Sequence, residues 1–215
     1  LAKQRASKKG VIEGSSLARG FAWLRPNDLI WNYVVNNYLL GDDPPAFDIL
    51  FWNADATNLS GSLMSDFLDL FEANAYADPG KFDIAGHTLD LTNVKGDMFI
   101  LGGTTDHITP WQACYRSTQL FGGKNIDFIL SQAGHMQSIL NPPGNPKAKY
   151  WRYTKGGKPP KDVKEWMKGT EEVAGSWWPY WIEWLQQRAG KQVAAKAVGS
   201  KAHPPMENAP GLYVL

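Results

Sequence analysis

The sequence has one cysteine, Cys114, among its 215 residues, so no disulfide can form within the chain. A single thiol is typical of a reducing compartment, and we therefore expect a cytoplasmic protein. No apolar run is long enough to cross a bilayer, and the first residues do not have the pattern of a signal peptide. These absences indicate a globular protein without a membrane span.

The sequence also has no large excess of charge of one sign, because 22 Lys and Arg and 21 Asp and Glu give a net charge of +1. This balance argues against binding to nucleic acid or to an anionic membrane through bulk attraction. The four histidines, at positions 87, 107, 135 and 203, do not have the spacing of metal ligands, and we expect neither a metal nor another cofactor. Partners must therefore be inferred from particular sites.

The two ends of the chain have compositions typical of loose structure. Residues 1–20 are basic and rich in Gly and Ser, which predicts a flexible segment, and residues 190–215 are rich in Ala, Lys and Pro. Between them, Pro26 and Gly41 have the positions of a helix start and a helix end. This helix is apolar nearly all round, so we expect it to be buried between layers. Residues 62–76 are expected to form an amphipathic helix.

A strand, a helix and a second strand are expected in the middle of the chain. Residues 97–103 and 126–132 are short, nearly continuous apolar runs, which are typical of strands covered on both faces of a parallel sheet. Thr109 and Pro110 predict the start of the connecting helix, and Gly122 with Gly123 its end. This pattern predicts a right-handed βαβ crossover in an α/β fold.

Asp106 follows the first of these strands and His135 follows the second. Because functional side chains gather at the carboxyl ends of the strands in open α/β sheets, both should project from one edge. An acid after one strand and a histidine after the next is the order of the α/β-hydrolases, in which the nucleophile comes first on a strand-to-helix turn. The sequence thus predicts an acid and a base that are neighbours in space.

The nucleophile is harder to find. Cys114 lies on one helix face with Trp111, Tyr115 and Thr118, which indicates a cysteine packed on the sheet; a reactive thiol is the alternative. No G-x-S-x-G occurs, and Ser138 falls in "HMQSIL", which predicts a buried helix start. Since the chain also begins with Leu1 and not Met, we expect it to be part of a longer polypeptide whose nucleophile precedes Leu1.

Residues beyond 140 are expected to be accessory to the sheet. "NPPGNPKAKYW" predicts a rigid proline-rich loop, and the segment after it predicts one helix and then a second, tryptophan-rich amphipathic helix. The tryptophans at 177, 178, 181 and 184 are expected to pack this helix on the sheet; contact with a polymer or a granule is the alternative.

Several stretches together resemble the C-terminal half of the catalytic domain of polyhydroxyalkanoate synthases, the bacterial poly(3-hydroxybutyrate) polymerases. They are "FAWLRPNDLIWNYVVNNYLLG", "PAFDILFWNADATNL", "TTDHITPW", "GHMQSILNPPGNPKA", "GSWWPYWIEWL" and "APGLYV". They occur in this order from Phe21 to the end of the chain, and the first twenty residues are not part of the resemblance. The motif "WWPYW" favours class I enzymes with short-chain substrates.

The resemblance implies an α/β-hydrolase-like fold: a cap or lid in residues 21–95 and the C-terminal part of a mostly parallel sheet in residues 96–189. It implies an acyltransferase with a Cys-His-Asp triad that polymerises (R)-3-hydroxyacyl-CoA and releases CoA. Asp106 and His135 match the family's catalytic acid and histidine, whereas Cys114 does not match its cysteine. A homodimer at the surface of polyester granules is also implied, and the 215 residues alone are expected to be inactive.

Three questions stay open at this stage. Asp106 either deprotonates the attacking hydroxyl group itself or only orients His135, which then makes both proton transfers. His107 is either structural or part of the substrate pocket. An esterase or depolymerase, or a non-catalytic module for granule association or dimerisation, is the alternative to a synthase.

Overall fold

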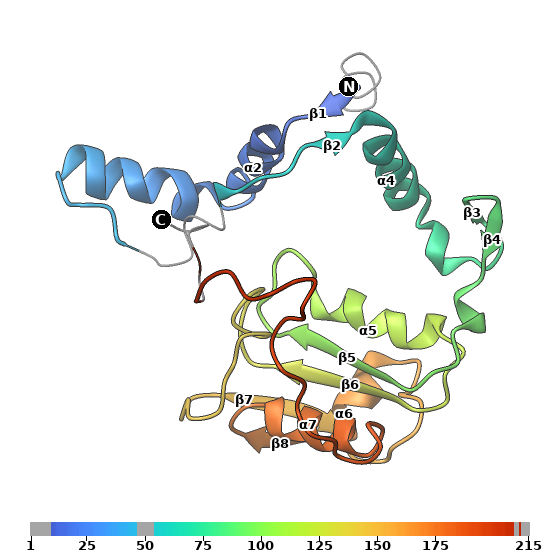
Figure 1. Ribbon diagram of the computed structural model, residues 1–215. Helices are drawn as coiled ribbons and strands as arrows, with labels where there is room; N and C mark the ends of the chain where they lie inside the picture. The colour runs from blue at the N-terminus through green and yellow to red at the C-terminus, as the bar shows by residue number, and fades with distance from the viewer. Residues whose placement is uncertain (1–9, 47–53, 209–210, 212–215) are drawn as a thin grey trace. The chain divides into compact units, whose positions relative to one another are not determined.

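A computed structural model describes residues 10–46, 54–208 and 211 (Figure 1). By its internal contacts the chain divides into two compact units, one formed by residues 1–73 and 195–215 and the other by residues 74–194. The assignment of residues 21–95 to a cap stays a prediction. Among the described residues, no helix combines the length and the apolar character needed to cross a membrane.

The first unit begins with more regular structure than predicted. Strand β1 (Val11–Ile12) pairs antiparallel with β2 (Leu59–Ser60), and helix α2 spans Gly14–Ala22. Gly14 is buried, its N–H donates to Asn58 Oδ1 at 2.9 Å, and a Cβ there would lie 2.8 Å from the Cβ of Ala56. Residues 10–20 of the predicted flexible segment therefore include regular structure, with close packing at Gly14. The remainder of that segment, residues 1–9, lies outside the described residues.

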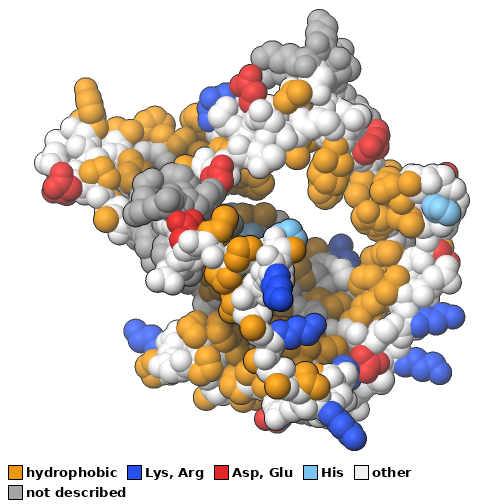
Figure 2. All heavy atoms as spheres, in the orientation of Figure 1, with side chains coloured by type: hydrophobic (Ala, Val, Ile, Leu, Met, Phe, Trp, Pro, Cys, Tyr) orange, Lys and Arg blue, Asp and Glu red, His pale blue; other side chains and the backbone are white. Residues whose placement is uncertain are grey.

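The helix expected between Pro26 and Gly41 is present as two wide, π-helical segments, η1 (Asn27–Trp31) and η2 (Val34–Leu39). The prediction that it is buried is wrong: Trp31 is 50% exposed and Tyr38 82%. Figure 2 shows hydrophobic side chains at the surface over this helix. An all-round apolar helix is buried only where other elements surround it, and here its large side chains face solvent.

Helix α4 (Gly61–Ala73) confirms the predicted amphipathic helix but ends three residues earlier. Asn74 adopts a left-handed conformation, φ 47°, which turns the chain out of the helix. A short 3-10 turn, η3 (Ala75–Ala77), follows. The hairpin of β3 (Phe82–Ile84) and β4 (His87–Leu89) comes next, with Ala85 and Gly86 at positive φ in its turn, and η4 (Leu91–Asn93) leads to the main sheet.

The main sheet has the order β5-β6-β7-β8. Strands β5 (Met98–Gly103) and β6 (Ile126–Ser131) are parallel, and α5 (Trp111–Leu120) connects them, which confirms the predicted βαβ unit. Strands β7 (Lys149–Tyr153) and β8 (Thr170–Ala174) extend the sheet with antiparallel pairing. Sequence reasoning missed both of these strands: β7 was read as the end of a loop, and β8 as part of a helical region.

Helices cover both faces of this sheet, as the alternation of side chains along β6 requires. Phe128 and Leu130 face Tyr115 of α5 and Trp166 of α6 (Val163–Lys168). Ile129, between them, faces the opposite side and packs with Tyr150 and with Trp177 at the start of α7 (Trp178–Gln186). Figure 1 shows α5 lying along β5 and β6. The predicted tryptophan-rich helix on the sheet is therefore present as α7.

The residues at the two ends of α5 have roles that differ from those predicted. Pro110, not Thr109, is the N-cap, and it makes no side-chain capping bond. The helix ends at Leu120, and Gly122 and Gly123 follow as predicted. Their role is close approach: a Cβ on Gly122 would lie 1.8 Å from Thr92 O, and one on Gly123 would lie 2.6 Å from Gly96 O.

Candidate active site

The loops after β5 and β6 continue the parallel pairing of these strands. Thr104 N–H donates to Ser131 O at 3.0 Å, and Thr105 N–H donates to Ala133 O at 3.1 Å. In return, Ala133 N–H donates to the hydroxyl oxygen of Thr104 at 3.2 Å. The two loops are therefore held side by side at the carboxyl edge of the sheet.

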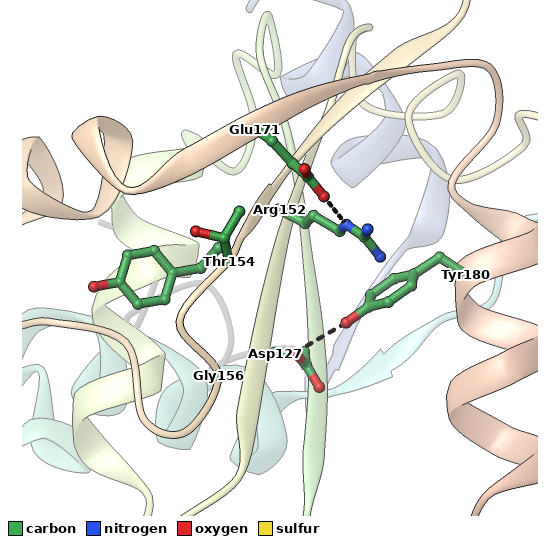
Figure 3. Close-up of a pocket in the computed structure, with 7 residues that line it drawn as sticks. Asp127, Arg152, Thr154, Gly156, Glu171 and Tyr180 are labelled. Carbon is green, nitrogen blue, oxygen red and sulfur yellow. Dashed lines mark hydrogen bonds and ion pairs between the residues drawn. The ribbon is translucent and has the colours of Figure 1, made fainter.

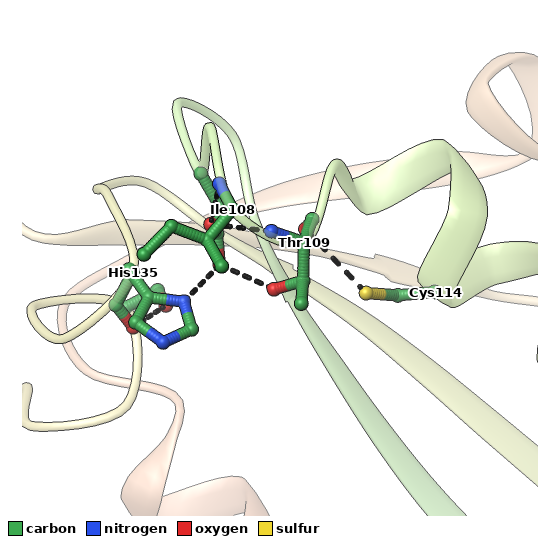
Figure 4. A network of polar contacts seen from close by, with 6 residues as sticks. Ile108, Thr109, Cys114 and His135 are labelled. Carbon is green, nitrogen blue, oxygen red and sulfur yellow. Dashed lines mark hydrogen bonds and ion pairs between the residues drawn. The ribbon is translucent and has the colours of Figure 1, made fainter. Parts of the chain in front are cut away.

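Asp106 and His135 meet where these loops end. His135 Nδ1 lies 2.9 Å from Asp106 Oδ2, which confirms the prediction that the two residues are neighbours. A dashed line in Figure 4 marks this contact at the His135 ring. The Asp106 side chain is 6% exposed, whereas that of His135 is 37% exposed. The buried carboxylate orients the ring, and Nε2 has no hydrogen-bond partner among the described residues, so it is free to exchange a proton with a substrate or a nucleophile.

Four hydrogen bonds converge on the Asp106 carboxylate. Oδ1 accepts from the N–H groups of Ile108 and Thr109, both at 2.9 Å, and Oδ2 accepts from the Thr109 hydroxyl at 2.7 Å as well as from His135. Burial by itself raises the pKa of Asp106, but the hydrogen bonds from Thr109, His135 and Ile108 outweigh it and hold this pKa far below its usual range. Asp106 is therefore a stable anion and a weak base.

Cys114 has the environment of a structural residue. It packs against the core formed around Tyr115 and Phe128, and the burial of Tyr115 and Thr118 confirms the predicted inner face of α5. Its Sγ is directed to Thr109 O at 3.6 Å and not to His135 (Figure 4). Burial raises the pKa of the thiol, with the Thr109 hydrogen bond opposing it, which disfavours the thiolate needed for attack.

Ser138 is buried as predicted, at 2% exposure, but the helix expected at "HMQSIL" is a turn. The turn is closed by hydrogen bonds from Ser138 N–H to Gly134 O and from Leu140 N–H to Met136 O, both 2.9 Å. The Ser138 hydroxyl donates to His135 O at 3.2 Å. Ser138 thus supports the histidine loop and is not exposed as a nucleophile.

His107 does not take part in this network. It is exposed, and the carboxylate of its neighbour Asp106 is directed to His135 instead. Whether His107 lines a substrate pocket stays a prediction. Within residues 10–46, 54–208 and 211, no three His, Cys, Asp or Glu side chains form a group that could hold a metal ion.

A polar pocket of about 430 Å³, separate from the Asp106–His135 pair, lies over strands β6, β7 and β8 (Figure 3). Arg152 Nε donates to Glu171 Oε1 at 2.5 Å, and the guanidinium lies 4.8 Å from the Tyr180 ring centre. Asp127 accepts from the Tyr180 hydroxyl at 3.3 Å. It is the second residue of β6, so this pocket is at the opposite end of the strand from the loop that carries His135. Sequence reasoning missed the pocket because β7 and β8 were not recognised as strands.

Residues 1–142 match a family model described as the alpha/beta hydrolase fold, and the chain belongs to this family. The predicted fold class is thereby confirmed. Its relatives are more specific: the chain is 51% identical over 214 residues to poly(3-hydroxyalkanoate) polymerase 1 of Ectopseudomonas oleovorans, covering 99% of this chain and 38% of that protein. It is 42% identical over 206 residues to the poly(3-hydroxyalkanoate) polymerase subunit PhaC of Cupriavidus necator, covering 95% of this chain and 34% of that protein.

These relatives confirm the resemblance and extend it. Polymerase 2 of Ectopseudomonas oleovorans is 49% identical over 215 residues, which is 100% of this chain and 38% of that protein. The prediction that the first twenty residues lie outside the resemblance is therefore wrong. The chain spans less than two fifths of the length of the polymerases that it matches.

Proposed function

We propose that this chain supplies the acid and the base of a poly(3-hydroxyalkanoate) polymerase. Such an enzyme transfers (R)-3-hydroxyacyl groups from CoA thioesters to a growing polyester and releases CoA. The observation that carries the proposal is the Asp106–His135 pair, joined at 2.9 Å in loops that follow adjacent parallel strands. Identity of 51% to a polymerase over nearly the whole chain supports it.

In the first half-reaction, His135 Nε2 accepts the proton of a cysteine thiol. The thiolate attacks the carbonyl carbon of the substrate thioester, the bond between this carbon and the sulfur of CoA breaks, and an acyl-enzyme thioester forms. The departing CoA thiolate takes the proton back from the imidazolium. Because the Cys114 thiol is directed to Thr109 and its pKa is raised, we assign the nucleophile to a cysteine outside these 215 residues.

In the second half-reaction, the hydroxyl oxygen of a 3-hydroxyacyl unit attacks the carbonyl carbon of an acyl thioester, an ester bond forms, and the bond between this carbon and the thioester sulfur breaks. A base must take the hydroxyl proton, which then passes to the departing thiolate. We assign this role to His135 and not to Asp106. The Asp106 carboxylate already accepts four hydrogen bonds, and its pKa is far below the usual range, so it has little tendency to accept a proton. Asp106 instead orients the ring and stabilises the imidazolium that each transfer creates.

The finer parts of the proposal concern assembly. We propose a homodimer that works at the surface of cytoplasmic polyester granules, with the CoA thioester as substrate and no metal or other cofactor. The exposed apolar side chains of η1 and η2 support a contact surface in this part of the chain, since large exposed apolar patches mark interaction sites. The polymerase relatives favour this function over an esterase or a non-catalytic module.

The test uses the complete polypeptide that contains this sequence, with 3-hydroxybutyryl-CoA as substrate and thiol titration of released CoA. Asp106→Asn and His135→Ala should each abolish release, whereas His87→Ala, a change at an exposed histidine of β4, should leave it near normal. Near-normal release in the Asp106 or His135 variant would refute the assignment. The 215-residue chain alone should release no CoA.

A further inference from the structure

Residues at the start of α7 are hydrogen-bonded to the loop that carries His135. Three side chains in a row donate hydrogen bonds to backbone carbonyl groups of this loop. Trp177 Nε1 donates to Ser138 O at 2.8 Å, Trp178 Nε1 donates to Ile139 O at 3.0 Å, and the Ser176 hydroxyl donates to Asn141 O. These bonds join parts of the chain that are 35 to 39 residues apart in sequence.

The same network reaches the histidine through Ser138. Its carbonyl oxygen accepts from Trp177, its hydroxyl donates to His135 O at 3.2 Å, and its N–H donates to Gly134 O at 2.9 Å. Ser138 and Trp177 are buried, at 2% and 7% exposure. Hydrogen bonds shielded from water are worth more than exposed ones, so this path restrains the backbone of His135 itself.

The loop has few apolar contacts of its own that could replace these bonds. Its large apolar side chains point to solvent: Met136 is 44% exposed, Ile139 49% and Leu140 56%. A loop with few buried apolar contacts opens easily unless its backbone is tied down. The hydrogen bonds from Ser176, Trp177 and Trp178 to the loop carbonyl groups are therefore the main restraint on the part of the loop that follows His135.

The donors are rigid because they belong to the packed core. The Trp177 ring lies 5.8 Å from the Phe99 ring of β5, and Trp177 forms a buried cluster with Ile129 and Tyr150 of the sheet. The Ser176 hydroxyl also accepts from Trp178 N–H at 3.0 Å, which orients it toward the loop. Because these donors are packed on the sheet, their hydrogen bonds fix the position of the His135 loop relative to the sheet.

We propose that Ser176, Trp177 and Trp178 are positioning residues that hold His135 at the place and angle required for its two proton transfers. This inference rests on the proposed function of His135. It assigns to the indole N–H groups a role beyond the packing expected from the sequence. The apolar faces of the two rings pack α7 on the sheet, while their N–H groups fix the loop.

The test separates the N–H groups from the rings. In the complete polypeptide, Trp177→Phe and Trp178→Phe keep an aromatic ring and remove the donor. Trp181→Phe is the matched control, because Trp181 packs 5.8 Å from Trp177 but its indole makes no hydrogen bond among the described residues. Four quantities are measured for each variant: amide hydrogen exchange of residues 134–141, kcat for CoA release, KM for CoA release, and the unfolding temperature.

We expect Trp177→Phe to raise exchange in residues 134–141 by about fivefold or more. We also expect it to lower kcat by about tenfold with KM changed less than about twofold, because a displaced catalytic group slows chemistry more than binding. Trp178→Phe should act in the same direction and Trp181→Phe should do neither. Ser176→Ala should lower kcat, and Ser176→Thr, which keeps the hydroxyl, should restore most of it.

Unchanged exchange in Trp177→Phe, with the protein folded, would overturn the inference whatever the activity. Raised exchange with unchanged kcat would also overturn it, provided that His135→Ala is inactive. A fully active His135→Ala would instead refute the proposed function of His135, and with it the positioning role, even if the exchange data showed that the loop is held by Trp177. A kcat loss of the same size in Trp181→Phe would reduce the effect to packing and count against the N–H groups.

Discussion

The Thr109 hydroxyl donates a 2.7 Å hydrogen bond to Asp106 Oδ2, the oxygen that also accepts from His135 Nδ1. Thr109 N–H donates to the other carboxylate oxygen at 2.9 Å. The residue expected to cap α5 therefore anchors the acid of the site instead. Because Thr109 directly precedes the N-cap of α5, it ties the position of Asp106 to this helix.

Thr109→Val keeps the shape of the side chain and removes its hydrogen bond to Asp106. We expect the pKa of Asp106 to rise from its lowered value and kcat for CoA release to fall by about tenfold or more, as for the loss of one hydrogen bond to a charged group. Thr109→Ser, which keeps the hydroxyl, should retain most activity. Equal activity of the Val and Ser variants would show that this bond does not matter for the reaction.

The lowered pKa of Asp106 also predicts how stability depends on pH. In the unfolded chain an aspartate titrates at about 3.9, and in the folded protein it titrates below this value. The ionised carboxylate therefore stabilises the fold above about pH 4, and this contribution is lost as the pH falls through the folded pKa. Denaturant unfolding of wild type and Asp106→Asn from pH 7 to pH 3 should show a stability difference that shrinks below about pH 4.

Cys114→Ala tests the assignment of the only cysteine to the core. We expect turnover to stay within a few-fold of wild type and the free energy of unfolding to fall by about 1–2 kcal/mol from lost packing. Thiol titration of CoA release and denaturant unfolding measure the two effects. Complete loss of activity in a folded variant would mean that Cys114 is the nucleophile after all.

Gly122→Ala tests the close approach that follows α5. Because the new Cβ would lie 1.8 Å from Thr92 O, the backbone must shift, and we expect a loss of about 2–3 kcal/mol or more in the free energy of unfolding. Gly96→Ala is the control, since a Cβ there would have no atom within 4 Å. Thermal unfolding of both variants gives the comparison, and equal stability would contradict the role of Gly122.

Three elements of the sheet unit follow from local sequence patterns: β5, α5 and β6. Both faces of the sheet are covered, so β5 and β6 have nearly continuous apolar runs that are easily recognised in the sequence. Pro110 and the Gly122–Gly123 pair mark the two ends of α5. Asp106 and His135 follow from the same reasoning, since parallel neighbours end at one edge. The exposure of η1 and η2 could not be predicted in this way. The apolar pattern of a helix shows which side chains it can bury, but not which elements surround it.

The sequence by itself determined the βαβ unit, the loops that carry Asp106 and His135, and the inner face of α5 that carries Cys114. Only the tertiary structure decided that residues 149–153 and 170–174 are antiparallel strands, since their pairing joins segments that local patterns leave ambiguous. Only the tertiary structure also showed that Trp177 donates a hydrogen bond to Ser138 O and that Thr109 donates to both carboxylate oxygens of Asp106. Periodicity determines which face a side chain occupies, whereas a directed hydrogen bond depends on how distant segments are packed together.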